Sequence, residues 1–410
     1  MTPPAGEAPP SSRTRWRMLA WICLAELGAL SLWFSATAVV PALRTPWMSA
    51  SAPAWLSMAV TLGFVAGTMA SALLTAVDAV GARRLFALSA GAGAAVNAAL
   101  LVVVDSWPAV LACRVLTGVA MAGAYPPGMK LAASWFVEGR GLAVGSLVGA
   151  LTLGAAVPHL LNYLGGLAWR PVIGVTSLAA LAAALVMLSR VEDGPHIQAR
   201  ARFDPACVGA LLRSRGVVLA NLGYFGHMWE LYAMWTWIGL YLAEAFRRAG
   251  VAGAPRRGAL ATAAVIGVGG LGCVAAGLVA DRIGRTATTM GAMLGSGACA
   301  AGIGLAFDRP GLLVVVALVW GVTIVADSAQ FSAAVTELAS PDYVGTALSL
   351  QTGAGFLLTL ASIWLIPRVV DAWGWPMSFL VLAPGPFLGT LAMWRLRLRP
   401  ESRRLARGRR

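Results

Sequence analysis

Six ionisable side chains lie within long apolar stretches of this sequence, and they are its strongest candidates for chemistry. The six are Glu26, Arg114, His159, His227, Glu230 and Asp327. An ionisable group at the centre of a membrane-spanning helix costs about 3 kcal/mol or more, so each one is a functional candidate by default. Loss of water favours the protonated form of a carboxyl group, which makes the three acidic members suitable proton carriers.

Glu230 is the leading candidate for proton transfer. His227 lies one helical turn before it on the same face of a helix, where the two groups are placed to pass a proton or to bind a polar group of a solute. The alternative is a hydrogen bond between helices, with Arg114 as the partner of Glu26 or Glu230. For Glu26 and Asp327 the functional and the structural interpretations remain equally open.

Side chains suited to a solute cavity lie near these groups. Phe225, Trp229 and Tyr232 follow one another at i, i+4 and i+7 on the helix that carries the second glutamate. Such a stripe is typical of helix packing or of an interfacial aromatic belt. Beside a carboxyl group it is also suited to hold a planar or cationic solute by stacking or cation–π contact. Gln330 extends a polar stripe that starts at Asp327, and it is a further cavity-lining candidate.

Other residues favour a structural interpretation. His159 directly follows Pro158, and because a proline inside a helix frees a backbone carbonyl, we expect that carbonyl to satisfy the imidazole. The five cysteines are scattered without a C-x-x-C pair, so neither a disulfide nor a metal site is predicted. No H-E-x-x-H, G-x-S-x-G or P-loop sequence supports catalysis. We therefore expect no enzyme activity, no metal and no cofactor.

The composition indicates that the elements that position these residues are membrane helices. Hydrophobic residues make up 59% of the 410 and charged residues only 12%, with a mean hydropathy of +0.76. A water-soluble chain of this length needs a more polar surface. Runs of about 20 apolar residues without strict alternation predict an all-α membrane protein with twelve transmembrane helices. The expected spans are about 18–43, 53–77, 85–104, 108–133, 141–164, 171–189, 217–245, 258–280, 286–306, 311–337, 345–366 and 375–394.

The basic residues predict the orientation in the membrane. With both termini in the cytoplasm, 22 of them fall on the inner side and eight on the outer side, as the positive-inside rule requires of a multi-pass protein of the cell (inner) membrane. The net charge of +14 therefore reflects orientation against an anionic leaflet rather than nucleic-acid binding. Four arginines between the seventh and eighth spans lie outside: Arg247, Arg248, Arg256 and Arg257. A solvated loop is the favoured interpretation, and a basic rim that attracts anionic solutes is the alternative.

The chain repeats itself at an offset of 203 or 204 residues. The matches are Glu26 and Trp33 with Glu230 and Trp237, Gly149 with Gly353, and Asp78 and Gly81 with Asp281 and Gly284. Repeated halves are common in secondary transporters. An even number of helices in each half predicts two parallel six-helix bundles, 18–189 and 217–394. They are joined by a cytoplasmic linker, 190–216, and flanked by a disordered N-terminus, 1–17, and a basic tail, 395–410.

The loop after the second helix of each half resembles the G-x-x-x-D-R-x-G-R signature of the major facilitator superfamily. The second half has it intact as Gly277, Asp281, Arg282, Gly284 and Arg285, and the first half keeps Asp78, Gly81, Arg83 and Arg84. Arg114 and Gly118 are similar to the family's R-x-x-x-G signature in the fourth helix. This resemblance implies a structural or coupling role for Arg114 rather than solute binding. The resemblance implies alternating access, with Asp78 at the start of the eleventh helix and Asp281 at the start of the fifth, near Arg140, holding the inner side closed. A tight hairpin with solvated charges is the alternative.

The function that these features favour is secondary active transport of a small organic solute, with protons as the coupling ion. A multidrug or metabolite efflux antiporter is the alternative within that class, and a receptor with a transporter fold is the alternative outside it. The expected partners are the solute, protons and the lipid bilayer, with no nucleic acid and a monomeric chain. By family comparison, the second and eighth spans lack the arginines of nitrate porters, which disfavours a strongly anionic substrate.

Overall fold

The computed structural model describes residues 12–43, 45, 47–136, 139–196, 205–340 and 343–409, with Arg140 and Pro205 described by their backbone alone. The first eleven residues of the predicted N-terminal segment and residues 197–204 of the predicted linker lie outside the described residues. The predicted contact of Asp281 with the side chain of Arg140 also lies outside the described residues.

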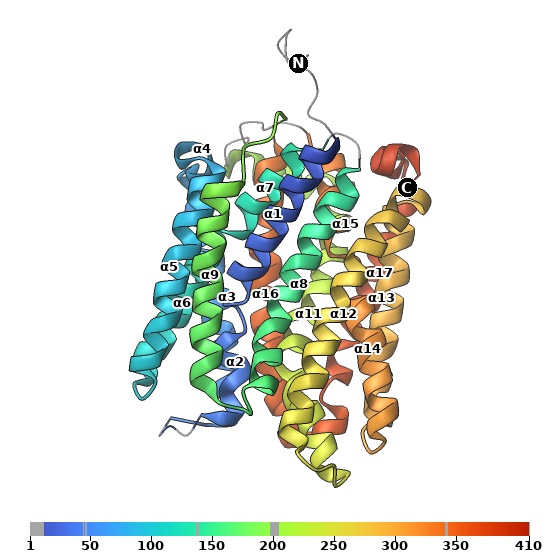
Figure 1. The fold of residues 1–410 in the computed structure, drawn as a ribbon. Coiled ribbons are helices and arrows are strands. Elements are labelled where there is room, and N and C mark those ends of the chain that lie inside the picture. The colour runs from blue at the N-terminus through green and yellow to red at the C-terminus, as the bar shows by residue number, and fades with distance from the viewer. Residues whose placement is uncertain are drawn as a thin grey trace.

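Figure 1 shows a bundle of long helices whose axes lie nearly parallel, with the chain running up and down the bundle in turn. The first half contains α1 (Ser12–Leu30), α2 (Ser35–Val39), η1 (Val40–Ala42), α3 (Ala52–Leu73), α4 (Ala76–Val80), α5 (Ala82–Val103), α6 (Trp107–Ala122), α7 (Tyr125–Ser134), α8 (Arg140–Leu164) and α9 (Trp169–Arg190). The second half contains η2 (Pro205–Cys207), α10 (Val208–Arg213), α11 (Arg215–Arg248), α12 (Ala254–Ile283), α13 (Arg285–Gly302), η3 (Ile303–Ala306), α14 (Pro310–Ala326), α15 (Ser328–Leu338), α16 (Val344–Trp373), η5 (Trp375–Met377), η6 (Leu380–Leu382), α17 (Pro384–Arg397) and η7 (Pro400–Gly408).

Each of the twelve predicted apolar runs forms a helix or a broken helix. Within the described ranges, ten segments are long and apolar enough to span a membrane, and the bent pair of α1 with α2 and η1 makes eleven. The remaining run is α11, whose 34 residues include the polar side chains of His227 and Glu230 and several Trp and Tyr rings. No strand occurs in the described part of the chain, so the predicted all-α fold is confirmed.

Three of the long helical segments are broken near their middle. The chain breaks between α6 and α7 at Gly123, just before the Tyr125-Pro126 pair, and between α14 and α15 at Asp327. The two break positions differ by the repeat offset, since 327 − 123 = 204. A proline explains the first of them because it supplies no N–H to the helix ladder. The third break, Ser31–Phe34, bends the first span by 53°, although it contains neither proline nor glycine.

Both ends of the described chain lie on one side of the bundle, which we call the termini side, and the opposite side is the distal side (Figure 1). Contacts between the halves run along α8 with α12 and along α3 with α16. A Cβ atom on Gly145 would lie 2.9 Å from the carbonyl oxygen of Cys273, and one on Gly149 would lie 3.0 Å from that of Gly270. Glycine is therefore what allows α8 and α12 to approach this closely, as small residues do at other membrane helix interfaces.

Candidate functional site

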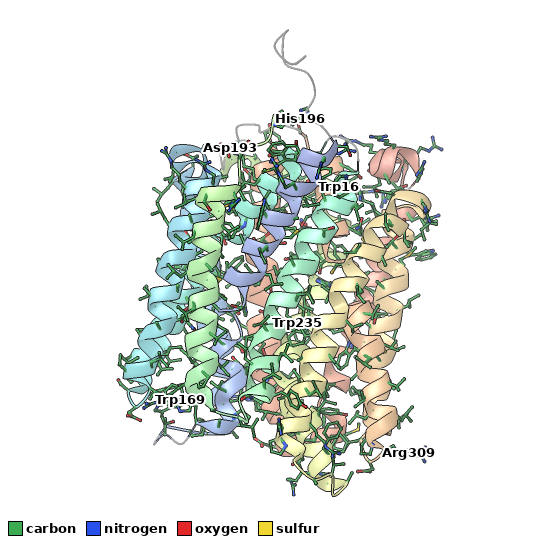
Figure 2. All side chains as sticks on the ribbon, in the orientation of Figure 1. Trp16, Trp169, Asp193, His196, Trp235 and Arg309 are labelled. Carbon is green, nitrogen blue, oxygen red and sulfur yellow. The ribbon has the colours of Figure 1, made fainter. Side chains whose placement is uncertain are left out.

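A cavity of about 350 Å³ opens on the termini side, where the exposed His196 forms part of its wall (labelled in Figure 2). We call it the termini-side cavity. Helices α7, α8, α11, α15 and α16 supply most of the wall, which combines aromatic rings with hydroxyl groups. Its polar and aromatic members include Tyr125, Tyr224, Tyr232, Ser328, Ser349, Thr352 and Phe356. A concave, mostly apolar pocket with a few polar groups is the usual form of a small-molecule site.

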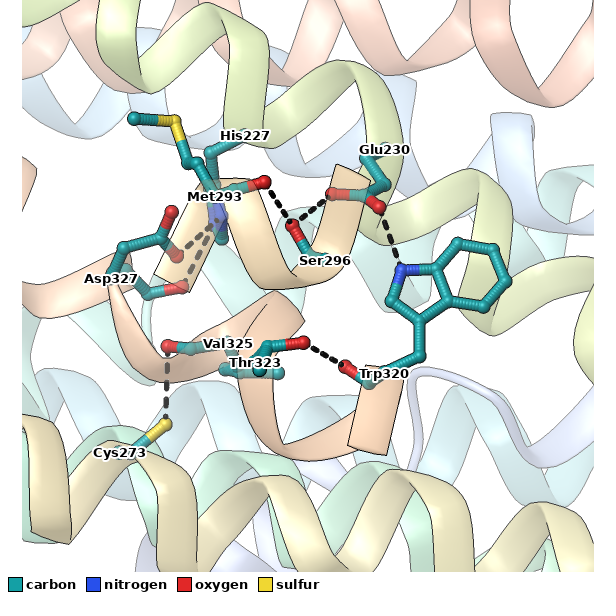
Figure 3. Close-up of polar contacts among 10 residues, drawn as sticks. His227, Glu230, Cys273, Met293, Ser296, Trp320, Thr323, Val325 and Asp327 are labelled. Carbon is teal, nitrogen blue, oxygen red and sulfur yellow. Dashed lines mark hydrogen bonds and ion pairs between the residues drawn. The ribbon is translucent and has the colours of Figure 1, made fainter. Parts of the chain in front are cut away.

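His227 is a buried ionisable side chain in this wall. Its Nδ1 lies 2.8 Å from Asp327 Oδ1 and its Nε2 lies 2.9 Å from Ser328 Oγ (Figure 3). The side chains of His227 and Asp327 are each 2% exposed. His227 and Asp327 lie within ion-pair distance of each other, but the contact does not have the alignment of a hydrogen bond. Asp327 Oδ1 accordingly has no hydrogen-bond partner among the described residues. The break between α14 and α15 produces this cluster, since it places two consecutive residues opposite His227 on α11.

Glu230 lies in a different hydrogen-bond network from His227. Its Oε2 accepts a hydrogen bond from Ser296 Oγ at 2.8 Å, and its Oε1 accepts one from Trp320 Nε1 at 2.6 Å (Figure 3). Glu230 is buried between α11, α13 and α14 and is absent from the wall of the termini-side cavity. The predicted pair of His227 and Glu230 therefore shares a helix turn, but the two side chains turn to different partners.

Glu26 is fully buried on α1, and neither of its carboxyl oxygens has a hydrogen-bond partner among the described residues. A Cβ atom on Gly128 would lie 2.5 Å from Glu26 Oε2, so the carboxyl group occupies space that exists because α7 has a glycine there. A buried polar group without a partner is uncommon and calls for an explanation.

Arg114 pairs with neither glutamate. Its Nη1 donates to the carbonyl oxygen of Leu32 at 3.1 Å and lies 3.3 Å from Ser35 Oγ, and its Nη2 donates to the carbonyl oxygen of Trp33. These carbonyls belong to the break between α1 and α2, where the regular helix ladder is interrupted. The guanidinium group thus satisfies backbone acceptors that the break leaves free.

The cavity-lining candidates divide between several surfaces. Tyr232 lies in the wall of the termini-side cavity. Trp229 donates from Nε1 to the Val381 carbonyl at 3.0 Å, and Gln330 accepts a hydrogen bond from Arg285 at 2.8 Å. Phe225 packs against the core and is not part of the wall. The pattern at i, i+4 and i+7 on one helix could not predict Ser328, Ser349 and Phe356, because these wall residues come from other helices.

Aromatic side chains close the termini-side cavity toward the distal side. Trp33 lies 5.3 Å from Tyr232 and 5.7 Å from Phe356, and Phe64 lies 4.6 Å from Phe356, between ring centroids. Trp235 joins them, with its ring 5.6 Å from that of Tyr232. We call these five residues the aromatic plug. They come from the break after α1 and from α3, α11 and α16, so the plug joins elements of both halves.

The two signature loops have the same backbone form and different side-chain contacts. Gly81 and Gly284 have φ angles of +87° and +95° directly before α5 and α13, a region that favours glycine. The Asp281 carboxyl group lies beside Gly141 at the start of α8, about 3 Å from where a Cβ atom would be. Asp78 instead pairs with Lys130 at 2.5 Å, within the first half.

Arginines near these loops bind nearby groups. Arg285 forms an ion pair with Glu337 at 2.6 Å, and Arg83 donates to the carbonyl oxygen of Val191 at 3.1 Å. Arg282 is exposed, and a Cβ on Gly277 would lie 3.0 Å from the Gly141 carbonyl. The basic tail continues into η7, whose Leu405 is fully buried and whose Ala406 N–H donates to Glu337 at 2.9 Å.

Comparison with known proteins identifies the family. The sequence matches the profile of the Major Facilitator Superfamily over residues 22–357 and 220–410. No curated protein sequence matches the chain.

Among solved structures, a partially occluded inward-open form of the xylose transporter XylE from E. coli is similar at 15% identity and a TM-score of 0.72, covering 94% of this chain and 98% of that one. A D-xylose-proton symporter is similar at 18% identity and 0.70, covering 96% and 98%. The nucleoside transporter NupG is similar at 14% identity and 0.69, covering 93% and 99%. With the profile match over essentially the whole chain, the two breaks at equivalent positions and the cavity between the halves, this protein belongs to the Major Facilitator Superfamily and has its transporter fold.

Proposed function

We propose that the protein couples proton movement to the transport of a small, uncharged organic solute through the termini-side cavity, and that the termini side faces the cytoplasm. The observation that carries the proposal is the buried contact of His227 with Asp327 and Ser328 in the cavity wall. A titratable pair shielded from water but adjacent to a solute cavity is the arrangement that proton coupling needs.

The cluster offers a simple means of coupling. When the imidazole is neutral with its proton on Nδ1, Nε2 is an acceptor and the Ser328 hydroxyl donates to it. When His227 is protonated, both ring nitrogens donate, so Ser328 Oγ accepts from Nε2 and its own hydrogen is free to point into the cavity. Asp327 Oδ1 lies 2.8 Å from Nδ1 on the other side of the ring. A solute with a hydrogen-bond acceptor at Ser328 is then bound more tightly with the proton present than without it.

The wall favours a neutral solute over a strongly charged one. Tyr125, Tyr224, Ser349 and Thr352 offer hydroxyl groups. Lys130, a basic residue of this wall, is already paired with Asp78. Aromatic and aliphatic side chains fill the remaining surface, which also suits an amphipathic compound and makes export in exchange for protons the second candidate.

Alternating access would require the plug and the signature loops to open in turn. The aromatic plug closes the distal end, and the Asp281 contact with the start of α8 joins the halves on the termini side. Opening toward the distal side separates Trp33 from Tyr232 and Phe356. We assign the loop of Asp281 to the gate between the halves, and the loop of Asp78 to a latch within the first half.

Uptake into proteoliposomes tests this function. A library of neutral, cationic and anionic solutes is screened for accumulation under an imposed pH gradient. We expect accumulation of a neutral solute that His227→Gln abolishes, while exchange of labelled for unlabelled solute without a gradient continues. Asp308→Asn, at an exposed distal position, is the control and should leave accumulation intact. Accumulation that His227→Gln leaves unchanged would contradict the coupling role.

A further inference from the structure

The outward face of α12 carries an apolar stripe that ends in an arginine on the termini side. Leu271, Ala275, Leu278 and Arg282 are all exposed. Their spacing at i, i+4, i+7 and i+11 places them on one face of the helix. The rest of α12 packs against its neighbours, and the helix lies between α8 and α14 (Figure 1). We call these four residues the α12 stripe.

The α12 stripe has the length of one membrane leaflet. Leu271 lies near the middle of the 30-residue helix, and Arg282 lies in its last turn. The 11 residues between them (282 − 271 = 11) correspond to about 16 Å along a helix axis. The hydrocarbon core of a bilayer is about 30 Å thick, so one leaflet takes about 15 Å. A lipid acyl chain that lies along the stripe therefore has its headgroup at the level of Arg282.

A second arginine reaches the same place from the C-terminal tail. Arg409 donates from Nη1 to the carbonyl oxygen of Asp281, the residue directly before Arg282. Both arginines are exposed. Two cations thus lie close together where the α12 stripe ends, although they come from distant parts of the second half.

The tail is attached to the protein rather than left as a solvated run of charge. Leu405 is fully buried, and the Ala406 N–H donates to Glu337 at 2.9 Å. Arg404 donates to the carbonyl oxygen of Leu338 at 3.1 Å. Groups that are ordered before binding lose less entropy when a ligand arrives. The contacts of the tail therefore prepare its arginines for binding.

Basic residues outnumber acidic ones around this site. The loop 281–285 and the tail 400–409 together contain six arginines and two acidic residues, Asp281 and Glu401, and Glu337 contacts both segments. The Asp281 carboxyl group lies beside the start of α8. Among the described residues, neither Arg282 nor Arg409 forms an ion pair. The planar guanidinium group matches the oxygens of a phosphate.

We propose that Arg282, Arg409 and the α12 stripe form a binding site for an anionic phospholipid. The phosphate group lies at the two arginines, and one acyl chain follows the stripe toward Leu271. The occupant is a lipid rather than a soluble anion, because the apolar stripe leads directly to the arginines. The lipid lies beside the contact of α12 with α8, where the two halves meet. Binding requires neither solute nor a gradient, so the site does not rest on the proposed function.

Nitroxide quenching in nanodiscs tests the site. Ala275→Cys, an exposed position within the stripe, is introduced into a chain whose five native cysteines are replaced, and it carries a fluorescent label. The discs are made of phosphatidylcholine with a small fraction of a lipid that bears a nitroxide on its acyl chain. This lipid is phosphatidylglycerol, phosphatidylethanolamine or phosphatidylcholine. Because a nitroxide quenches only at short range, we expect phosphatidylglycerol to quench at an about tenfold lower mole fraction than either zwitterionic lipid.

The variants identify the groups that hold the lipid. Arg282→Gln and, separately, Arg409→Gln should each reduce the preference for phosphatidylglycerol by about three- to fivefold, since one arginine near a membrane surface contributes about 1 kcal/mol. Arg282→Lys keeps the charge and should keep most of the preference. Arg84→Gln, at an exposed position on the termini side of the first half, is the matched control and should leave it unchanged. Quenching by the phosphatidylcholine nitroxide at the parent level verifies that the labelled face is intact.

Equal quenching by the three lipids would overturn the proposal. An equal loss of preference in Arg84→Gln would do so as well, because the overall charge of the protein would then explain the result. Displacement of phosphatidylglycerol by sodium phosphate, but not by sodium chloride of the same ionic strength, would show that the site takes a soluble anion instead of a lipid. Transport is not measured at any step, so failure here and failure of the proposed function are distinguishable.

Discussion

The two halves of the chain carry a glutamate at equivalent positions and surround it differently. Glu230 accepts hydrogen bonds from two side chains, whereas Glu26 has no partner among the described residues. At the repeat offset, the positions of the two donors, Ser296 and Trp320, are held in the first half by Ala92 or Gly93 and by Leu116 or Thr117. The Thr117 hydroxyl is already bonded to the carbonyl of its own helix turn. The first half therefore lacks the donors that satisfy the second glutamate.

The helices that carry the two glutamates differ in the same way. The first span breaks at Ser31–Phe34, whereas the equivalent stretch, 235–238, lies inside the continuous α11. Arg114 donates to the carbonyls of the break, and its equivalent in the second half is Ala317 or Leu318. The repeat thus determines where the helices run, while individual hydrogen-bonding side chains determine where a helix breaks and which carboxyl group is satisfied.

Arg114→Leu, which copies the second half, should have the largest effect. It removes the donors to the carbonyls of Leu32 and Trp33, at about 1–3 kcal/mol for each buried acceptor. We expect a clear fall in the thermal unfolding temperature in detergent and loss of transport. Arg114→Lys should recover only part of both, because an ammonium group lacks the planar fork that reaches two acceptors. Wild-type stability in Arg114→Leu would break the link between this arginine and the helix break.

Glu230→Leu should be the next most destabilising change. It leaves the indole N–H of Trp320 buried without an acceptor, at a cost of about 1–3 kcal/mol. It also removes one of the two acceptors of the Ser296 hydroxyl, which keeps the carbonyl oxygen of Met293 at 3.3 Å. Glu230→Gln retains an acceptor for one of these donors and should lose less. The unfolding temperature of the two purified variants gives the comparison directly, and equal stability of Glu230→Leu and the parent would contradict it.

Glu26→Leu should act in the opposite direction and by less. No donor is lost, and a buried polar group without a partner is removed, so we expect unchanged stability or a gain of about 1–2 kcal/mol. Paired thermal unfolding of Glu26→Leu and Glu230→Leu sharpens the contrast between the halves. A destabilised Glu26→Leu would mean that the carboxyl group has a stabilising contact in the folded protein.

The two signature loops should give the smallest effect on stability. Asp78→Asn breaks a partly exposed ion pair with Lys130, which is worth about 0–1 kcal/mol. Asp281→Asn should also leave folding and membrane insertion intact but reduce transport, because Asp281 contacts α8 of the other half. Normal transport rates in Asp281→Asn proteoliposomes would remove the gating role.

Sequence patterns predict the helices of this fold well and their contacts poorly. The apolar runs locate all twelve helical segments, because the length of a spanning helix is determined by the bilayer. The break before Tyr125-Pro126 has a sequence signal in its proline. The break at Ser31–Phe34 has none, since the side chain that donates to its free carbonyls, Arg114, lies some 80 residues away in the sequence.

The candidate site shows the same limit. Glu230 and His227 share a helix face, so a single-helix argument pairs them with each other. Their actual partners come from α13, α14 and α15, and which of these helices faces which side chain depends on tertiary packing. Asp327 stood out in the sequence, but its pairing with His227 depends on the helix break beside it.

Proton movement on addition of solute tests the central claim most directly. A pH-sensitive dye inside solute-free proteoliposomes records the proton flux that accompanies solute entry, and labelled solute records the solute flux. We predict a fixed ratio of protons to solute in the parent and in Glu26→Gln, and solute entry without proton movement in Asp327→Asn. An unchanged ratio in Asp327→Asn, or its loss in Glu26→Gln instead, would contradict the assignment of coupling to the second half.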